Sequence, residues 1–349
     1  MRKAISVFMT LFFASNLLLA GCGGGESGGG ASKPEVKSAP SGGGKQAVKI
    51  GFIVKQPEEP WFQMEHKFAR QAAEELGFEL LELAGIDGEK ALAQIDNLGV
   101  QKAAGFVICT PDVKLGPAIM SYAKRNNMKV IAVDDRFIGN DGQPMEDVHY
   151  LGIAARAIGE DVGKALYEQL QARGWPVEET GVCAVTYEEL DTAKERTDGA
   201  ITALIEAGFP ESQIYKAPQK TTDVNGALQA VDILLVQQPD VKYWLVCGMN
   251  DSAVLGAVRS MAARGFTHED VCGIGINGTD CIDELKKENP TGFYGSMLLQ
   301  AKKHGYETAK MMYEWVTKDQ EPPLDTRTRG ILITRENFRE VLKDQGYEI

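Results

Sequence analysis

Polar and aromatic side chains follow directly on an apolar stretch that begins at residue 48. Residues 48–54, VKIGFIV, predict a buried strand, and two prolines soon afterwards predict that the strand ends in a loop. This loop carries Lys55, Glu59, Trp61 and Phe62. A cation, an anion and two flat rings can hold a polar ligand through charged hydrogen bonds and stacking. The alternative is a solvated turn whose two rings pack beneath the next helix.

Further polar residues stand at corresponding points later in the chain. They are Asp134 and Asp135 after one apolar run, Arg196 early in a predicted helix, and Asn250 and Asn277 after two more runs. Neighbouring residues on a strand point to opposite faces, so we expect one of the two aspartates to face a ligand directly. The asparagines have an alternative role, because asparagine is also a favoured N-cap of helices.

The elements that must position these residues alternate between strand and helix. Apolar runs predict strands at residues 48–54, 78–83, 105–109, 129–133, 181–186, 213–217, 243–246, 271–276, 292–298 and 330–334. Helical periodicity separates the runs, beginning with a helix over residues 65–76. The alternation predicts parallel sheets covered by helices, with the ligand edge at the carboxyl ends of the strands. The predicted fold is therefore α/β, with two similar domains, each a parallel sheet flanked by helices, joined by a hinge.

The predicted site favours binding of a neutral ligand over catalysis. The cations Lys55 and Arg196 balance the anions Glu59 and Asp135, and a sugar offers both hydroxyl groups and an apolar face for a ring. The rival hypothesis is a glycoside hydrolase that uses Glu59, Asp134 and Asp135 as acid and base. Against an enzyme, the sequence has no Ser/His/Asp order, no dinucleotide motif and no metal-ligand spacing. We expect no cofactor and no metal, and the four histidines on the surface. Apolar runs predict that Cys109, Cys183, Cys247 and Cys272 are buried free thiols.

The N-terminal segment predicts export and attachment to a membrane. Residues 1–21 combine a basic start with an apolar run, as in a signal peptide. They end in Leu-Ala-Gly before Cys22, which resembles the lipobox of bacterial lipoproteins and predicts lipidation of that cysteine. Residues 22–45 are rich in glycine, serine and proline and predict a flexible tether. The formal net charge of −12 argues against a nucleic-acid partner.

Long motifs run along the sequence between residues 48 and 344. They are GFIVKQPEEPWF, GFVICTPD, MKVIAVDD, ELDTAKERT, AGFPESQIY, GMNDS, GIGING and TGFYGSML. Together they resemble the bacterial L-arabinose-binding proteins, which are sugar receptors of ABC importers with the type I periplasmic-binding-protein fold.

This resemblance implies a set of ligand-binding residues. The implied sugar contacts are Lys55, Glu59, Trp61, Asp134, Asp135, Arg196, Asn250 and Asn277, with Asp280 acting through water. The implied pocket walls are Phe62, Cys109, Leu190, Thr192 and Met249. Asp135 resembles the residue that bonds the anomeric hydroxyl. One departure is Ile153, which stands where the family has a methionine beside the ring substituent that separates L-arabinose from D-galactose and D-fucose. Its stiff, β-branched side chain leaves the preference among these sugars open.

The family topology also implies the domain boundaries and the mode of action. Crossovers near Ile153, Leu299 and Thr328 give one domain of residues 46–153 plus 300–328 and another of residues 154–299 plus 329–349. The implied protein is a monomeric, lipid-anchored extracytoplasmic receptor that binds L-arabinose in the cleft, closes by hinge motion and delivers it to an ABC permease. D-galactose and D-fucose are further candidate ligands. The alternative is a receptor for another monosaccharide such as D-galactose or D-xylose, and a sugar enzyme ranks third.

Overall fold

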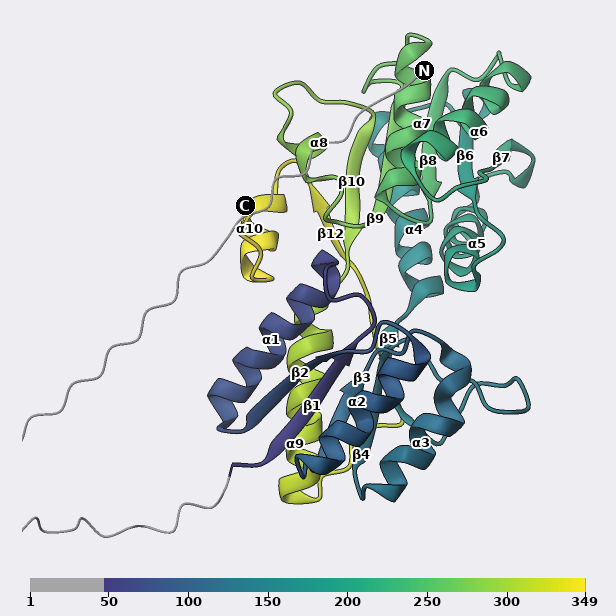
Figure 1. Cartoon of the computed structure of the whole chain (residues 1–349). Helices are drawn as coiled ribbons and strands as arrows, with labels where there is room; N and C mark the ends of the chain where they lie inside the picture. The colour runs from purple at the N-terminus through teal and green to yellow at the C-terminus, as the bar shows by residue number, and fades with distance from the viewer. Residues whose placement is uncertain (1–46, 349) are drawn as a thin grey trace, which may run out of the picture. The chain divides into compact units, whose positions relative to one another are not determined.

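The apolar runs form two six-stranded sheets, which the computed structural model describes within residues 47–348 (Figure 1). The strand order is β11-β5-β4-β3-β1-β2 in the first sheet and β12-β10-β9-β8-β6-β7 in the second. Neighbouring strands are parallel except for the antiparallel pair β10 and β12. The predicted α/β class is confirmed. The predicted signal peptide, Cys22 and the tether lie outside the described residues.

The first sheet combines the N-terminal part of the chain with one late strand. Its strands are β1 (Lys49–Val54), β2 (Glu79–Ala84), β3 (Gly105–Ile108), β4 (Lys129–Asp134), β5 (His149–Ile153) and β11 (Asp325–Thr328). The accompanying helices are α1 (Pro60–Leu76), α2 (Gly88–Val100), α3 (Gly116–Arg125) and α9 (Thr308–Lys318), with the short segments η1 (Val113–Leu115) and η4 (Lys303–Glu307), the latter π-helical.

The second sheet takes up the rest of the described chain. Its strands are β6 (Thr180–Thr186), β7 (Ile214–Pro218), β8 (Tyr243–Gly248), β9 (Val271–Asn277), β10 (Phe293–Leu298) and β12 (Ile331–Thr334). The helices are α4 (Ala155–Arg173), α5 (Asp191–Glu206), α6 (Val224–Gln237), α7 (Asp251–Ala263), α8 (Ile282–Lys286) and α10 (Phe338–Asp344), with the 3-10 turns η2 (Val177–Glu179) and η3 (Glu211–Gln213).

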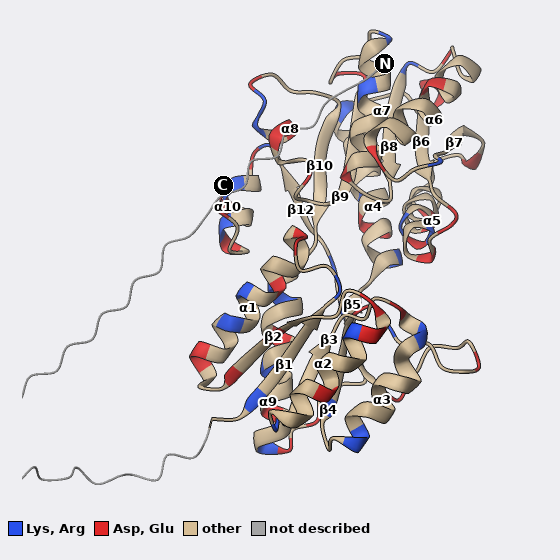
Figure 2. Ribbon diagram, in the orientation of Figure 1, with Lys and Arg blue, Asp and Glu red and all other residues tan. Residues whose placement is uncertain are grey.

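Side chains of β1 alternate between two buried clusters, one on each face of the first sheet. Ile50, Phe52 and Val54 pack with α1 and α9, whereas Ile53 packs with α2 and α3. A strand buried on both faces needs a continuous apolar run. Residues 48–54 accordingly carry a single polar side chain, that of Lys49 at the start of β1. Charged residues gather instead on the helices and loops (Figure 2).

The second sheet is covered in the same way, and one of its helix crossings positions a candidate site residue. Helices α6, α7 and α10 cover one face, and α4 and α5 cover the other. A Cβ on Gly159 of α4 would lie 2.0 Å from the carbonyl oxygen of Arg196 on α5. Glycine therefore allows a close approach that fixes the backbone carrying Arg196.

Helix α1 begins five residues earlier than predicted, at Pro60 instead of residue 65. Proline is favoured in the first turn of a helix, because its missing N–H would have no partner there. Trp61 and Phe62 consequently lie on the first turn of α1, and our prediction of a loop for them was wrong. Phe62 is buried in the cluster between α1 and the first sheet.

We predicted no strand at β5 or β11 and no helix at α10. β11 has the sequence Asp-Thr-Arg-Thr and shows no apolar pattern. It lies at the edge of the first sheet and pairs only with β5. α10 spans Phe338–Asp344 and is too short for a helical period to stand out. β11 and α10 therefore form because tertiary contacts supply what their local sequence does not.

The predicted burial of Cys109, Cys183, Cys247 and Cys272 is confirmed, whereas the histidine prediction was wrong in two cases. Among the described residues all five cysteines are buried and free. His149 and His304 are buried instead of exposed. Each has hydrogen-bond partners at both ring nitrogens, and such pairing makes burial of a polar ring tolerable.

The described chain passes between the two sheets three times. It leaves the first sheet after β5, returns after β10 through η4, and passes again between β11 and β12. The predicted domain boundaries fall at these passages and stay a prediction. Within residues 47–348, no helix has both the length and the apolar character needed to cross a membrane.

Candidate ligand-binding site

The carboxyl edge of the first sheet brings Lys55, Asp135 and Cys109 together from the ends of β1, β4 and β3. Lys55 Nζ donates to Asp135 Oδ2 at 2.5 Å, and Cys109 Sγ lies 3.6 Å from the same oxygen. Burial lowers the pKa of Lys55, but its acidic neighbours Cys109, Asp135 and Asp134 outweigh that effect and raise the pKa above its ordinary value. The Lys55 and Asp135 side chains are 28% and 34% exposed, so this ion pair can still reach a ligand.

The two neighbouring aspartates point to different partners, as expected at a strand end. Asp134 is the last residue of β4, and its φ of +64° ends the extended conformation of the strand there. Its Oδ2 accepts a hydrogen bond from Trp61 Nε1 at 3.0 Å, and its Oδ1 lies 2.6 Å from His304 Nδ1. Burial raises the pKa of Asp134, but the bonds from His304 and Trp61 hold it below the usual range. Asp134 is thus an ionised carboxylate with internal donors.

The two aromatic rings of the first turn of α1 have different surroundings. Lys55 Nζ lies 5.9 Å from the centroid of the buried Phe62 ring, which orients the cation. Trp61 is half-buried, packs edge-on against His304 with centroids 5.1 Å apart, and contacts the apolar clusters of both sheets. Trp61 therefore stands where the two sheets approach one another.

Arg196 is the cation of the second sheet's edge. Its Nη1 donates to the Met249 carbonyl oxygen at 2.8 Å, and its buried Nε has no hydrogen-bond partner among the described residues. Burial lowers the pKa of Arg196 to about 10, so the guanidinium stays charged at neutral pH. A fixed cation with an unused buried donor is suited to a ligand oxygen.

The two asparagines differ in their local roles. Asn250 is the N-cap of α7: its Oδ1 accepts from the Ala253 N–H at 2.8 Å, and its Nδ2 donates to the Thr222 carbonyl at 3.3 Å. The Asn250 side-chain oxygen is therefore used as the helix cap, as the alternative predicted. One hydrogen of the side-chain amide remains available for another partner. Asn277 ends β9 with a φ of 124°. The peptide bond between Asn277 and Gly278 is fixed by Asp251, because the Gly278 N–H donates to the buried Asp251 carboxylate at 3.0 Å.

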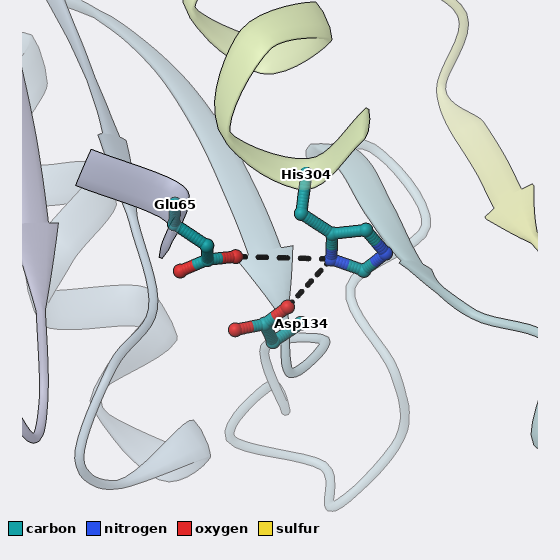
Figure 3. A group of neighbouring side chains, drawn as sticks. All are labelled: Glu65, Asp134 and His304. Carbon is teal, nitrogen blue, oxygen red and sulfur yellow. Dashed lines mark hydrogen bonds and ion pairs between the residues drawn. The ribbon is translucent and has the colours of Figure 1, made fainter. Parts of the chain in front are cut away.

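The remaining predicted site residues form no side-chain hydrogen bond with one another within the part of the chain that the structure describes. Glu59, Leu190, Thr192 and Asp280 are exposed, Ile153 is half-buried, and Met249 is buried. Two buried groups beside the site were not predicted: Glu65, on the buried face of α1, and His304, on η4. Figure 3 shows that Glu65, Asp134 and His304 face one another. The signal for Glu65 was a charge on the apolar face of α1, recognisable once the helix is extended to Pro60.

Two parallel sheets with opposed polar residues at their strand ends define a binding protein of two α/β halves. The family described as "Periplasmic binding proteins and sugar binding domain of LacI family" matches residues 47–341, and the chain belongs to this family. The predicted family is thereby confirmed, and membership makes the protein a binding protein and not an enzyme.

Curated relatives narrow the comparison. The L-arabinose-binding periplasmic protein of Escherichia coli (strain K12) is 54% identical over 300 residues, which cover 86% of this chain and 91% of that protein. The ABC transporter L-arabinose-binding periplasmic protein of Azospirillum brasilense is 45% identical over 300 residues, covering 86% and 90%.

Solved structures support the fold. A periplasmic ribose ABC transporter protein from Conexibacter woesei has a TM-score of 0.70 at 19% identity, covering 86% of this chain and 97% of that one. An arabinose-binding protein from Geobacillus stearothermophilus has a TM-score of 0.66 at 16% identity, covering 84% and 99%.

Proposed function

We propose that this protein is an extracytoplasmic receptor that binds L-arabinose and delivers it to the membrane permease of an ABC importer. The main support is the 54% identity to the E. coli L-arabinose-binding periplasmic protein across nearly all of that protein. The site chemistry agrees with this proposal. The Lys55–Asp135 pair neutralises itself and still offers donors and acceptors, which suits an uncharged ligand with many hydroxyl groups.

The proposed ligand contacts are those of the two sheet edges. They are Lys55, Glu59, Trp61, Asp134, Asp135, Arg196, Asn250 and Asn277, with Asp280 through water and with Phe62, Cys109, Leu190, Thr192 and Met249 as walls. Arg196 and the Lys55–Asp135 pair belong to different sheets, so one ligand can engage both only between them. The protein closes on the ligand by hinge motion at the three chain passages, with domains of residues 46–153 plus 300–328 and 154–299 plus 329–349. It acts as a monomer.

A sugar titration tests this function. L-arabinose, D-galactose, D-fucose, D-xylose and D-ribose are titrated separately into the purified protein while heat and tryptophan fluorescence are recorded. We expect the tightest binding for L-arabinose and a change in emission, because Trp61 lies beside the proposed ligand. No response to any of the five sugars would refute the receptor proposal, and a preference for ribose or xylose would refute the arabinose assignment.

Ile153 sets the preference among closely related sugars in this proposal. It is half-buried and packs against the apolar cluster of the second sheet, so its branched side chain has little freedom. We expect Ile153→Met to improve binding of D-galactose relative to L-arabinose by up to about tenfold, since a flexible chain makes room for the extra ring substituent. The measurement is the ratio of the two Kd values, with Ile233→Met on the exposed side of α6 as control. An unchanged ratio would show that Ile153 does not read this substituent.

Lipid attachment at Cys22 is the proposed means of holding the receptor at the membrane. Multiple acylation provides stable anchoring, whereas a single chain binds only marginally. We expect Cys22→Ala to move the protein from the membrane to the soluble fraction, and globomycin to raise the mass of the Cys22-containing peptide by blocking removal of residues 1–21. A protein that remains soluble with an unmodified Cys22 would contradict the anchor.

A further inference from the structure

Glu65 is a buried carboxyl group without a hydrogen-bond donor. It is 0% exposed, and neither of its carboxylate oxygens has a donor among the described residues. It sits where α1 crosses η4, and the crossing is tight: a Cβ on Gly305 would lie 2.2 Å from the Glu65 carbonyl oxygen. An ionised carboxylate in such surroundings costs several kcal/mol.

The groups nearest to the Glu65 side chain are another carboxylate and an imidazole. Polar atoms of Glu65, Asp134 and His304 all lie within 4.8 Å of one another, and Glu65 Oε1 is 3.8 Å from His304 Nδ1 (Figure 3). His304 Nδ1 is engaged with Asp134 Oδ1 at 2.6 Å, and its Nε2 lies 2.7 Å from Thr328 Oγ1. No neighbour named here is free to donate to an ionised Glu65.

Ionisation of both carboxyl groups at this distance in a buried site is strongly unfavourable, and their hydrogen bonds decide which one keeps the proton. Asp134 receives bonds from Trp61 and His304, which stabilise its negative charge. Glu65 receives none and gains a partner only by donating. The arrangement is asymmetric, so the proton belongs to Glu65.

We propose that Glu65 is a neutral carboxylic acid whose O–H donates to the Asp134 carboxylate, and that Glu65 and His304 are positioning residues that fix Asp134 and, through it, Trp61. The effect on the ligand edge rests on the proposed function, whereas the protonation state does not. Burial, followed by the charge of Asp134, raises the pKa of Glu65 well above its ordinary value, in agreement. Asp134 and His304 face Glu65, and the other titratable groups whose charges act on it are Asp135, Lys55 and Cys109.

The protonation state is tested without any sugar by infrared spectroscopy. In protein carrying isotope-labelled glutamate, we expect at neutral pH a carbonyl band of a protonated carboxyl group that is absent from Glu65→Gln. If Glu65→Gln does not fold, the labelled wild type alone decides, because exposed glutamates are ionised at neutral pH. Absence of the band would overturn the proposal.

Thermal unfolding supplies an independent measurement with a defined sign. Above the ordinary glutamate pKa the unfolded chain releases the proton that folded Glu65 retains, so this group lowers stability as pH rises toward its raised folded pKa. Glu65→Gln cannot ionise, and we expect its Tm advantage over the wild type to grow between about pH 5 and about pH 8. A pH-independent difference would overturn the assignment, as would a zinc-induced rise in Tm that Glu65→Gln abolishes, which would make the cluster a metal site.

The positioning role is read from Trp61 by NMR. We expect Glu65→Leu, which has no donor, to shift the Trp61 indole N–H resonance and weaken sugar binding several-fold, and Glu65→Gln, which retains a donor, to restore both. An indole resonance that is the same in the two variants would overturn the positioning role. If no sugar binds to any form, the receptor proposal fails while the infrared band and the indole resonance still decide this one.

Discussion

Replacing Arg196 by alanine is expected to weaken L-arabinose binding by more than about 2 kcal/mol, or about thirtyfold in Kd. The guanidinium is held by the Met249 carbonyl at 2.8 Å and stays charged at neutral pH, so its free donors point a fixed charge at the ligand edge. A neutral hydroxyl that loses a charged donor in a closed cleft is left without a partner. Isothermal titration calorimetry gives the affinity directly.

The matched control for this change is Arg156→Ala on α4. Arg156 is exposed and bonds to Thr202 and Glu160 on the outer surface, so its removal should leave Kd within twofold of the wild type, or roughly 0.4 kcal/mol. Arg196→Lys is informative as well, because lysine keeps the charge but not the planar set of donors. Equal affinities for the wild type and Arg196→Ala would show that Arg196 only supports the Met249 loop.

Replacing Asp135 by alanine is the second change with a large expected effect, again more than about 2 kcal/mol in binding. The substitution removes the acceptor proposed for the anomeric hydroxyl and also leaves Lys55 Nζ without its 2.5 Å partner. Both side chains are about one-third exposed, so water compensates part of the loss in the open protein but less in the closed one. We therefore expect a larger change in Kd than in Tm.

Asp135→Asn separates shape from charge. The amide keeps the size and one acceptor oxygen, so we expect a smaller loss of affinity than with alanine. Asp147→Ala, on the exposed segment before β5, serves as the surface control and should leave Kd unchanged. A Tm loss without a change in Kd would make the Lys55–Asp135 pair a structural ion pair.

The fold could be predicted because most strands are buried on both faces. Such strands need uninterrupted apolar runs, as in residues 50–54, and these runs can be recognised in the sequence without knowing which strands they pair with. β11 could not be predicted, because its four residues are polar and its partner strand β5 lies far away in the sequence. The antiparallel direction of β12 is likewise set by tertiary structure, since it depends on where the chain returns and not on its own residues.

The sequence predicts charged residues near strand ends, but it does not predict the contacts that support them. Lys55 and Asp135 follow β1 and β4 directly, and parallel strands of one sheet end at a common edge, whereas Arg196 lies on α5, the helix that follows β6 of the second sheet. The bond between Trp61 and Asp134 could not be foreseen, because it depends on α1 starting at Pro60. His304 had no local signal, since its partners Asp134 and Thr328 come from other strands.

The late return of the chain to the first sheet also has a consequence for folding order. Ala309 and Met312 of α9 complete the apolar cluster over β1, and β11 completes the edge beside β5. During synthesis from the N-terminus, only α1 is available to cover that face of the first sheet until almost the whole chain has been made. The second half, apart from β12 and α10, is complete earlier in sequence. Contacts of such long sequence separation slow folding, so the N-terminal half is expected to be the last to gain its native packing.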